Sequence, residues 1–335
     1  MDVGGSNVLV TGADGFIGSH LVERLVAAGA RVTALSLYNA FDSCGWLDSL
    51  AGDVRAAVRI ARGDVRDPQC MDDVMAGQEI VFHLAALIGI PYSYAAARSY
   101  VDVNVTGTLN VLEAARRHGV GRVVHTSTSE VYGTALRTPI DETHPLQGQS
   151  PYAASKIGAD AMVEAYARSH ALQAVTLRPF NTFGPRQSER AVIPTVIRQA
   201  LDPRCAAIRI GDATPRRDFS YVADTVEAFL AVATSDRIHP GSVYNSGAGV
   251  AASVADVVDL VRRITGTDKP LETQEARFRP ADSEVRLLLA DAERLSTATG
   301  WRPRRSLESG LETTVAWWRE RIAQGALRPD SGYVT

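Results

Sequence analysis

The strongest constraint on the fold is an alternation of short apolar runs with amphipathic helical segments over residues 1–182. The strand-like runs are NVLVT, RVTALS, VRIARGD, EIVFHLAA and GRVVHTS, and segments such as FIGSHLVERLVAAG and RSYVDVNVTGTLNVLEAARRHG lie between them. Strands and helices that alternate at this spacing form βαβ units around a parallel sheet. The sequence therefore predicts an α/β fold with a doubly wound parallel sheet.

A glycine-rich turn follows the first apolar run directly and opens the first helical segment. Its Gly12, Gly15 and Gly18 permit a tight turn and a close approach of backbone to a pyrophosphate, which the helix N-terminus would hold. The spacing differs from the G-x-G-x-x-G of simple dehydrogenases. Because strand, turn and helix follow in the required order, the sequence predicts a Rossmann-type, NAD(P)-binding domain.

The choice between NAD and NADP depends on the end of the second strand. This strand ends in Ser36-Leu-Tyr-Asn39, without the acidic residue that usually takes the ribose hydroxyls of NAD. No arginine stands near Ser36 to Asn39 to meet a 2′-phosphate, so the sequence favours NAD over NADP. Asp64 in GDVRD is a candidate partner of the adenine amino group, although an aspartate that caps its own turn fits equally.

The alternation gives way to a mixed helix and strand pattern beyond residue 182, and no Gly/Ser-rich or proline-rich linker separates the halves. We expect residues 1–182 to form the NAD(P)-binding domain. Residues 183–323 are expected to form a smaller, substrate-binding α/β lobe, whose strands can cross back between the lobes. Residues 324–335 are expected to form a loose tail.

Composition and charge exclude several classes of function. A net charge of −3 and a pI near 6.2 give no basic field for nucleic acid or an anionic membrane. The N-terminus lacks a signal peptide pattern and no uncharged stretch approaches the roughly 20 residues that span a bilayer, so we expect a cytoplasmic protein. Cys44, Cys70 and Cys205 have neither disulfide nor metal spacing, and we expect free thiols and no metal.

Tyr152 and Lys156 are four residues apart at the start of a predicted helix, so both side chains project from one face. A phenol with a pKa of about 10 is a poor base at neutral pH, and a neighbouring ammonium lowers that pKa by favouring the phenolate. Only two of the 35 basic residues are lysines, which favours a functional pair over a surface pair. We predict that the pair exchanges a proton with an alcohol.

The stretch HTSTSEVYG ends the strand that precedes the Tyr152 helix. Ligands of doubly wound sheets bind at the carboxyl ends of strands, so Thr128, Ser129 and Glu130 are expected to face the same crevice. Thr128 is a candidate proton relay, and Glu130 is either a general base for a carbon acid or a capping or surface glutamate. His83 and His125 lie in apolar runs and are expected to be satisfied core histidines.

Several motifs resemble those of the extended short-chain dehydrogenase/reductases that act on nucleotide sugars, and the resemblance covers nearly the whole chain. They are TGADGFIGSH, GDVRD, HLAA, NVTGTLN, TSTSEVYG, YAASK, RPFNTFGPR and RRDFSYVAD. The Thr128-Ser129-Glu130 triplet is similar to that of GDP-mannose 4,6-dehydratases. The stretches LYNAFDSCGWLD, ALIGIPYSY and HPLQGQSPYAASKIGAD resemble the N-acetylglucosamine-nucleotide 4,6-dehydratases of legionaminic-type pathways.

The resemblance implies a set of site residues. The catalytic residues would be Thr128, Ser129, Glu130, Tyr152 and Lys156. The cofactor would be held by Gly12, Asp14, Gly15, Phe16, Ile17, Gly18, Ser36, Asp64, Val65, Leu84, Ala85, Ala86, Thr126, Tyr152, Lys156, Pro179 and Asn181. The nucleotide sugar would be held by Ile88, Tyr92, Asn104, Asn181, Arg190, Arg217 and Arg279. A guanidinium suits phosphate through paired donors, although each arginine could equally serve a surface salt bridge.

The reaction implied is a 4,6-dehydration of UDP- or GDP-linked N-acetylglucosamine, with oxidation at C4, loss of water across C5 and C6, and return of the hydride. UDP-glucuronate decarboxylases also carry Thr-Ser-Glu, so a decarboxylase, an epimerase or a 5,6-dehydratase stays open. A non-catalytic dinucleotide sensor is a more distant alternative, because it has no use for Tyr152 and Lys156. In the resembling family, helices equivalent to residues 104–117 and 151–169 pair across a two-fold axis, so we expect a homodimer.

Overall fold

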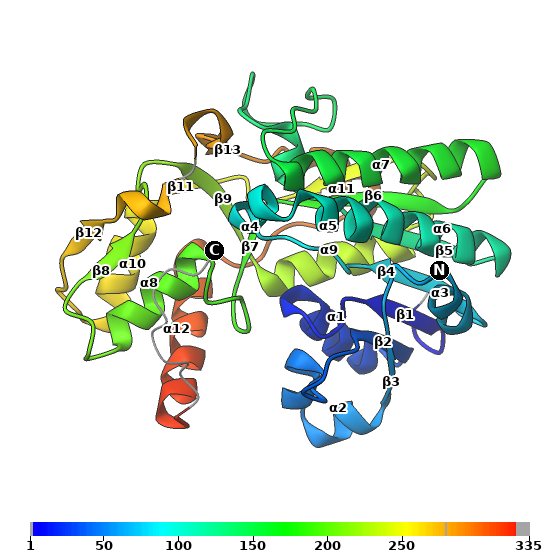
Figure 1. Ribbon diagram of the computed structural model, residues 1–335, viewed down its shortest axis with the longest axis horizontal. Coiled ribbons are helices and arrows are strands. Elements are labelled where there is room, and N and C mark those ends of the chain that lie inside the picture. Colours follow the sequence, from blue (N-terminus) through cyan, green and yellow to red (C-terminus); the bar gives the residue numbers. More distant parts are fainter. Residues whose placement is uncertain (1–2, 279, 326–335) are drawn as a thin grey trace.

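A parallel sheet of seven strands forms the centre of the larger lobe in the computed structural model, which describes residues 3–278 and 280–325 (Figure 1). The strand order is β10-β6-β5-β4-β1-β2-β3, so the winding direction changes between β1 and β4. The strands are β1 (Asn7–Thr11), β2 (Arg31–Leu37), β3 (Val58–Gly63), β4 (Ile80–His83), β5 (Arg122–Thr126), β6 (Ala174–Pro179) and β10 (Val243–Ser246). This arrangement confirms the predicted doubly wound fold, and its ligand crevice is expected at the carboxyl ends of β1 and β4.

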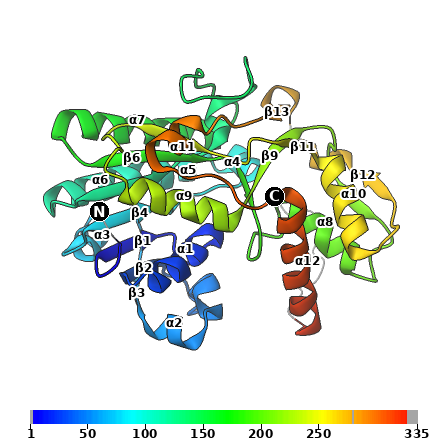
Figure 2. The same cartoon turned by 180° about the vertical axis from the view of Figure 1, so that it is seen from behind.

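Helices cover both faces of this sheet (Figures 1 and 2). One face carries α1 (Phe16–Ala27), α9 (Val222–Thr234) and α11 (Glu293–Thr299), and the other carries α3 (Pro68–Met75), α6 (Gly107–Arg117) and α7 (Pro151–His170). Side chains of β1 alternate between the two layers. Val8 and Val10 pack into the first core and Leu9 into the second. Burial on both faces explains why these strands read as continuous apolar runs.

A smaller lobe lies at the left of Figure 1. Its sheets contain β7 (Asn181–Phe183), β9 (Arg216–Tyr221), β11 (Ala251–Ser253) and β13 (Leu287–Leu288), and separately β8 (Ile208–Ile210) with β12 (Leu271–Thr273). Its helices are α8 (Val192–Leu201), α10 (Val254–Thr265) and α12 (Leu307–Ala323). Between them the chain crosses back into the larger lobe, because β10 pairs with β6 and α9 packs on β5 and β6. Of the predicted tail, the structure describes Gln324 and Gly325, and residues 326–335 lie outside the described residues.

The remaining short elements lie in the connections between these strands and helices. They are α2 (Gly52–Ala56), α4 (Ile90–Ala95), α5 (Ala97–Tyr100), the 3-10 turns η1 (Gly45–Ser49), η3 (Ser129–Tyr132), η4 (Glu275–Arg277) and η5 (Ala281–Ser283), and the π-helical segment η2 (Val101–Thr106). The hydroxyls of Tyr94 in α4 and Ser283 in η5 lie 2.6 Å apart, and Ser283 donates to the Gln149 carbonyl at 2.7 Å. These contacts tie η5 of the smaller lobe to α4 and to the segment that precedes α7.

Within the part of the chain that the structure describes, no helix combines the length and the apolar character needed to cross a bilayer.

Candidate active site

The glycine turn after β1 has no room for a side chain at Gly12 or at Gly18. Gly12 has a φ of 65°, and a Cβ there would lie 2.7 Å from the Ala85 nitrogen; a Cβ on Gly18 would lie 2.2 Å from the Gly12 carbonyl oxygen. The Thr11 hydroxyl accepts hydrogen bonds from the backbone of Leu84 and Ala85, both at 3.2 Å. The turn and the segment that follows β4 therefore meet where the winding direction changes.

The helix α1 begins directly after this turn, with Gly15 at its N-cap and no side chain capping its first N–H groups. Open N–H groups at a helix N-terminus favour a diphosphate, so the predicted pyrophosphate position is consistent with the fold. Two further polar atoms at strand ends support the same interpretation. Thr126 Oγ1 and Asn181 Oδ1 are buried without a hydrogen-bond partner in the described residues. Such atoms are rare in proteins unless a ligand or water satisfies them, so the residues present fit a dinucleotide.

Asp64 and Val65, predicted to contact the adenosine, follow β3. The Asp64 carboxylate accepts from the Arg66 backbone at 2.9 Å and from its guanidinium at 2.5 Å. These bonds to Arg66 lower the pKa of Asp64. Val65 packs against α6, where a Cβ on Gly107 would lie 2.8 Å from its side chain. The structure thus gives Asp64 the turn-capping role, and its contact with adenine stays a prediction.

The helix α7 places Tyr152 and Lys156 on one buried face, as predicted. Ser150 caps the helix by accepting from the Ala153 nitrogen at 3.1 Å, and Pro151 occupies the first helical position. Tyr152 is 7% exposed and Lys156 is 3% exposed. The Lys156 ammonium donates to the Thr126 carbonyl at 2.5 Å, which fixes it at the end of β5.

The turn η3 brings Thr128 and Glu130 to the same phenol. Thr128 accepts from the Glu130 nitrogen at 3.2 Å, and its side chain lies close enough to the Tyr152 phenol to affect the pKa of that phenol. Burial raises the pKa of Tyr152, the Thr128 hydroxyl lowers it, and the nearby Glu130 charge raises it further. The structure therefore unites the predicted catalytic groups of Thr128, Glu130 and Tyr152.

The net lowering of the Tyr152 pKa that was expected from Lys156 is not found in the structure. The net pKa of Tyr152 is raised, because burial and the Glu130 charge dominate and the ammonium is directed at the Thr126 carbonyl. Burial also lowers the pKa of Lys156 to about 8, against the attraction of Asp160. An ammonium in this position is thus close to losing its proton under mildly alkaline conditions.

This lowered pKa predicts a pH-dependent stability. Between pH 8 and 10.5 the unfolded chain keeps a proton on Lys156 that the folded protein has released. The unfolded state then binds more protons, so the free energy of unfolding rises with pH across this window, by on the order of 3 kcal/mol. Denaturant unfolding of the wild type and of Lys156→Met should show the rise only in the wild type. Parallel curves for the two proteins would contradict the lowered pKa.

Tyr100 is a site residue that the sequence did not reveal. Its ring centroid lies 6.2 Å from that of Tyr152 and 6.2 Å from that of Tyr92, and its hydroxyl donates to the Gly89 carbonyl. Tyr92 is the exposed member of this group, at 44%, and Ile88 in the segment before α4 is 65% exposed. An aromatic wall therefore extends outward from the Tyr152 phenol. Nothing in the surrounding ARSY stretch signals this contact.

Asp160 is the second residue that sequence reasoning missed. It lies one turn beyond Lys156, and its Oδ2 accepts from the Ser127 hydroxyl at 2.8 Å and from the Arg178 guanidinium at 2.9 and 3.0 Å. Burial raises the pKa of this carboxyl, but its contacts with His125, Arg178 and Lys156 outweigh burial and leave the pKa lowered. A buried ion pair thus fixes α7 against β5 and β6 beneath the catalytic groups.

The two histidines lie in the core, as expected, but only one is satisfied. His83 shares hydrogen bonds with Thr11 at 2.8 Å and Thr108 at 3.0 Å, and burial lowers its pKa well below 6.5. His125 lies 3.4 Å from Asp160 without hydrogen-bond geometry, and burial lowers its pKa to about 4. Both rings are therefore neutral near pH 7.

The residues predicted to hold the nucleotide sugar differ in their surroundings. Asn104 is saturated internally: its amide bonds the Leu87 backbone at 2.8 and 3.0 Å and the Ser155 hydroxyl at 2.9 Å. This arrangement positions the segment before α4 against α7, and a direct substrate contact of Asn104 gains no support. Asn181 lies at the start of β7, two residues after the end of β6.

The arginines predicted to bind phosphate lie on the smaller lobe and its connection. Arg217 is buried in β9 and donates to Glu284 at 2.9 Å. Arg190 is exposed, and its charge is close enough to Tyr100 to lower the pKa of that phenol against the raising effect of burial. Arg279 lies outside the described residues.

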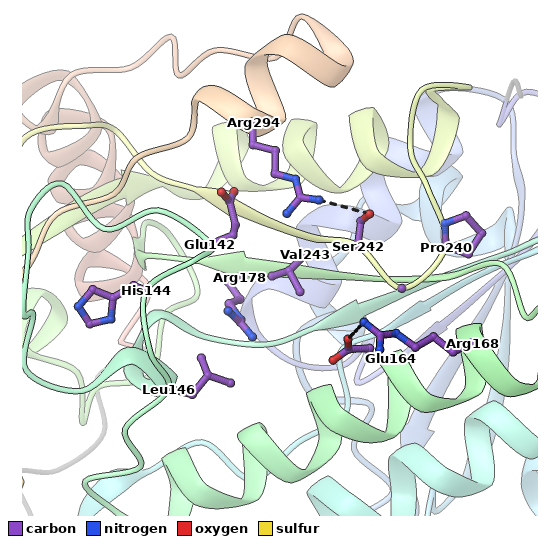
Figure 3. Close-up of a pocket in the computed structure, with 11 residues that line it drawn as sticks. Glu142, His144, Leu146, Glu164, Arg168, Arg178, Pro240, Ser242, Val243 and Arg294 are labelled. Carbon is purple, nitrogen blue, oxygen red and sulfur yellow. Dashed lines mark hydrogen bonds and ion pairs between the residues drawn. The ribbon is translucent and has the colours of Figure 1, made fainter.

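A separate polar cavity of about 460 Å³ lies beside the C-terminal half of α7 (Figure 3). Arg168, Arg178 and Arg294 line it together with Glu142 and Glu164. The acidic residues offset the arginines; Arg168, for example, pairs with Glu164 at 2.6 Å. The lining contains no residue of the predicted site, so this cavity is distinct from the crevice.

Comparisons with known proteins agree with this geometry. The model of the family described as GDP-mannose 4,6 dehydratase matches residues 9–314. A dTDP-glucose 4,6-dehydratase of Streptomyces griseus is 37% identical over 322 residues, which cover 94% of each chain.

Two solved structures are similar over almost their whole length. MoeE5, in complex with UDP-glucuronic acid and NAD, is 33% identical with a TM-score of 0.82, covering 94% of this chain and 99% of its own. A UDP-N-acetylglucosamine 4-epimerase from Methanobrevibacter ruminantium M1, in complex with UDP-N-acetylmuramic acid, is 29% identical with a TM-score of 0.84, covering 95% and 99%. Together with the glycine turn and the common face of Tyr152 and Lys156, the match over residues 9–314 shows that the chain belongs to the GDP-mannose 4,6 dehydratase family of extended short-chain dehydrogenase/reductases that act on nucleotide sugars.

Proposed function

We propose that the protein is an NAD-dependent 4,6-dehydratase of UDP- or GDP-linked N-acetylglucosamine. The observation that carries the proposal is the position of Glu130, whose charge acts on the same buried phenol that Thr128 contacts. Exchange of a proton with an alcohol needs only the phenol and its relay. A carboxylate beside them adds a base for a carbon acid, which an elimination requires.

The cofactor is NAD in this proposal, in line with the expectation from the sequence and with the NAD bound by MoeE5. The glycine turn and the N-terminus of α1 would hold its pyrophosphate, and the unpartnered atoms of Thr126 and Asn181 would meet its nicotinamide half. When bound, it supplies the acceptor for the hydride of C4 and the donor that completes the cycle.

The first task of the chain's own residues is to take the proton of the C4 hydroxyl. Tyr152 accepts this proton, with the Thr128 hydroxyl as its relay. The phenol must first lose its own proton, which burial opposes. Lys156 keeps its proton below pH about 8, and in this proposal its positive charge offsets part of the cost that burial puts on the phenolate.

The second task is the elimination. A ketone at C4 acidifies the C5 proton, and the Glu130 carboxylate removes it. Glu130 or Ser129 then protonates the departing C6 hydroxyl, so that water leaves without net oxidation of the sugar. Ser129 is 2% exposed and adjoins Glu130 in η3, which supports a short path between the two proton transfers.

A panel of nucleotide sugars in deuterated water tests the reaction. We expect UDP- or GDP-N-acetylglucosamine to lose one water and to gain one deuterium at C5, because a proton held by a carboxyl exchanges with solvent before it returns. Mass spectrometry with NMR of the product measures both changes.

The same panel separates the alternatives. Loss of carbon dioxide from UDP-glucuronate would identify a decarboxylase, and inversion at C4 without loss of mass would identify an epimerase; either result would overturn the dehydratase. Loss of water with a retained 5,6-alkene would show that the hydride returns to C4. This result would refute only the last step of the proposed reaction, the return of the hydride to C6.

The assembly and location remain predictions. A second copy of the chain is the expected partner, docked through α6 and α7. Small residues support this contact, because Ala154, Ala161 and Ala165 are exposed on the outer face of α7 and would allow a neighbouring helix to approach closely. Cytoplasmic location is expected from the sequence.

A further inference from the structure

A carboxylate lies at the end of β2 although β2 itself ends without an acidic residue. It belongs to Asp14, which stands directly before Gly15 in the glycine turn. Its Oδ2 accepts from the Ser36 hydroxyl at 3.0 Å and from the Leu37 nitrogen at 3.2 Å. In Rossmann folds an acidic residue at this place takes the hydroxyls of the adenosine ribose. The glycine turn therefore places a carboxylate at the end of β2, where β2 itself has none.

The surrounding chain holds Asp14 firmly in this position. The Trp46 nitrogen donates to the Asp14 carbonyl at 3.0 Å, and a Cβ on Gly45 would lie 2.5 Å from that oxygen. Ser36 is fully buried, so its hydroxyl is a fixed donor. These contacts restrain the backbone and one carboxylate oxygen of Asp14.

The second carboxylate oxygen is available to a ligand. Among residues 3–278 and 280–325, Oδ1 of Asp14 accepts no hydrogen bond and the carboxylate forms no ion pair. Asp14 is half-buried, and its Oδ1 is not among the buried side-chain atoms without a partner, so this oxygen is accessible to a ligand. An unpaired negative charge next to the position of the adenosine ribose repels any anionic group placed there.

One arginine does approach the end of β2, contrary to the expectation from the sequence. Arg62 pairs with Ser36 across β3 and β2. Its guanidinium donates to the Ser43 carbonyl at 2.6 Å and to Asp42 at 3.1 Å, both in the loop that follows β2. Because these bonds engage Arg62 in the loop, the carboxylate of Asp14 dominates the ribose position.

We propose that Asp14 replaces the missing acid of β2: its Oδ1 accepts the 2′-hydroxyl of the adenosine ribose, and its charge excludes a 2′-phosphate. The inference rests on the proposed use of a dinucleotide. Asp14 thereby sets the preference for NAD, since a like charge at close range strongly disfavours the phosphorylated cofactor.

Calorimetric titration of the purified protein with NAD and with NADP tests this role through binding alone. The wild type is expected to prefer NAD by about 100-fold or more, from one charged hydrogen bond and the repulsion of the phosphate. In Asp14→Asn the amide oxygen still accepts from Ser36 and Leu37, and the amide N–H₂ is left to face the ribose. The variant should bind NAD more weakly and NADP more tightly, so that the preference falls at least about tenfold.

Asp48→Asn is the matched control. Its carboxylate accepts from the Cys44 nitrogen at 2.7 Å and the Ser43 hydroxyl at 3.2 Å in the same loop, so the variant changes the local charge equally without removing a group from the ribose. Its preference for NAD should equal that of the wild type. An equal loss of preference in both variants, or an unchanged preference in Asp14→Asn, would overturn the role of Asp14. A wild type that binds neither dinucleotide would overturn the proposed function itself.

Discussion

Glu130→Gln is expected to lower the rate of water elimination by about 100-fold or more, while folding and dinucleotide binding stay intact. The amide has the shape of the carboxylate but cannot take up the C5 proton. In the described part of the chain the Glu130 carboxylate accepts no hydrogen bond, and its backbone nitrogen provides the contact with Thr128. Removing the charge therefore leaves no buried partner unsatisfied.

The Glu130→Gln variant should separate the oxidation at C4 from the elimination of water. Because the Glu130 charge raises the pKa of Tyr152, its removal favours the phenolate and spares the oxidation at C4. We expect deuterium exchange at C5 and loss of water to fall together, as measured by mass spectrometry of the sugar. Glu164→Gln, an exposed position on α7 that pairs with Arg168, is the matched control and should keep full activity. Near-normal water loss in Glu130→Gln would exclude Glu130 as the base.

The larger lobe could be predicted because its signals are local. The central strands β1 and β4 are largely apolar runs, and Val8, Leu9 and Val10 of β1 show how both faces of one strand are buried. The return of the chain after residue 182 depends on a distant pairing instead. Val243 pairs with Thr176 in the sheet, and no local pattern in either strand specifies the other.

The two lysines share a structural feature that their rarity did not predict. Lys269 donates to the carbonyls of Gln199, Ala200 and Asp202 at 2.7, 3.1 and 2.7 Å, and so caps the end of α8. Lys156 likewise donates to a backbone carbonyl. Both lysines stand where a compact ammonium meets backbone carbonyls, and the functional role of Lys156 stays a prediction.

The catalytic spacing could be predicted, but the electrostatics of the site could not. A separation of four residues places Tyr152 and Lys156 on one face of any helix. The pKa of each group depends on burial by Tyr100 and on Asp160, which reach the site from other elements or from the next helical turn. The spacing of residues along the chain does not reveal these contacts. For that reason the sequence predicted a lowered pKa for Tyr152, whereas the structure raises it.

Tyr152→Phe is expected to lower oxidation at C4 by about 10²–10⁴-fold, the range of one acid–base group. The ring keeps its contact with Tyr100, so the fold should persist while the hydroxyl that Thr128 contacts is lost. Appearance of reduced nicotinamide in a single turnover measures the step. Tyr100→Phe is the matched control, since its hydroxyl donates to the Gly89 carbonyl instead of the relay. An equal loss in both variants would show that the aromatic wall, and not the Tyr152 proton, limits the reaction.

Lys156→Met extends the test to the pH profile. The ammonium of the wild type is charged below pH about 8 and aids the phenolate there, so the variant should be slow at neutral pH. An unassisted phenol in water would recover near its usual pKa of about 10. Because burial raises the pKa of Tyr152 above its usual 10, recovery of the variant should be displaced to still higher pH. Recovery at pH 10 would mean that solvent reaches the phenol, and a variant as fast as the wild type at neutral pH would remove Lys156 from the proton transfer.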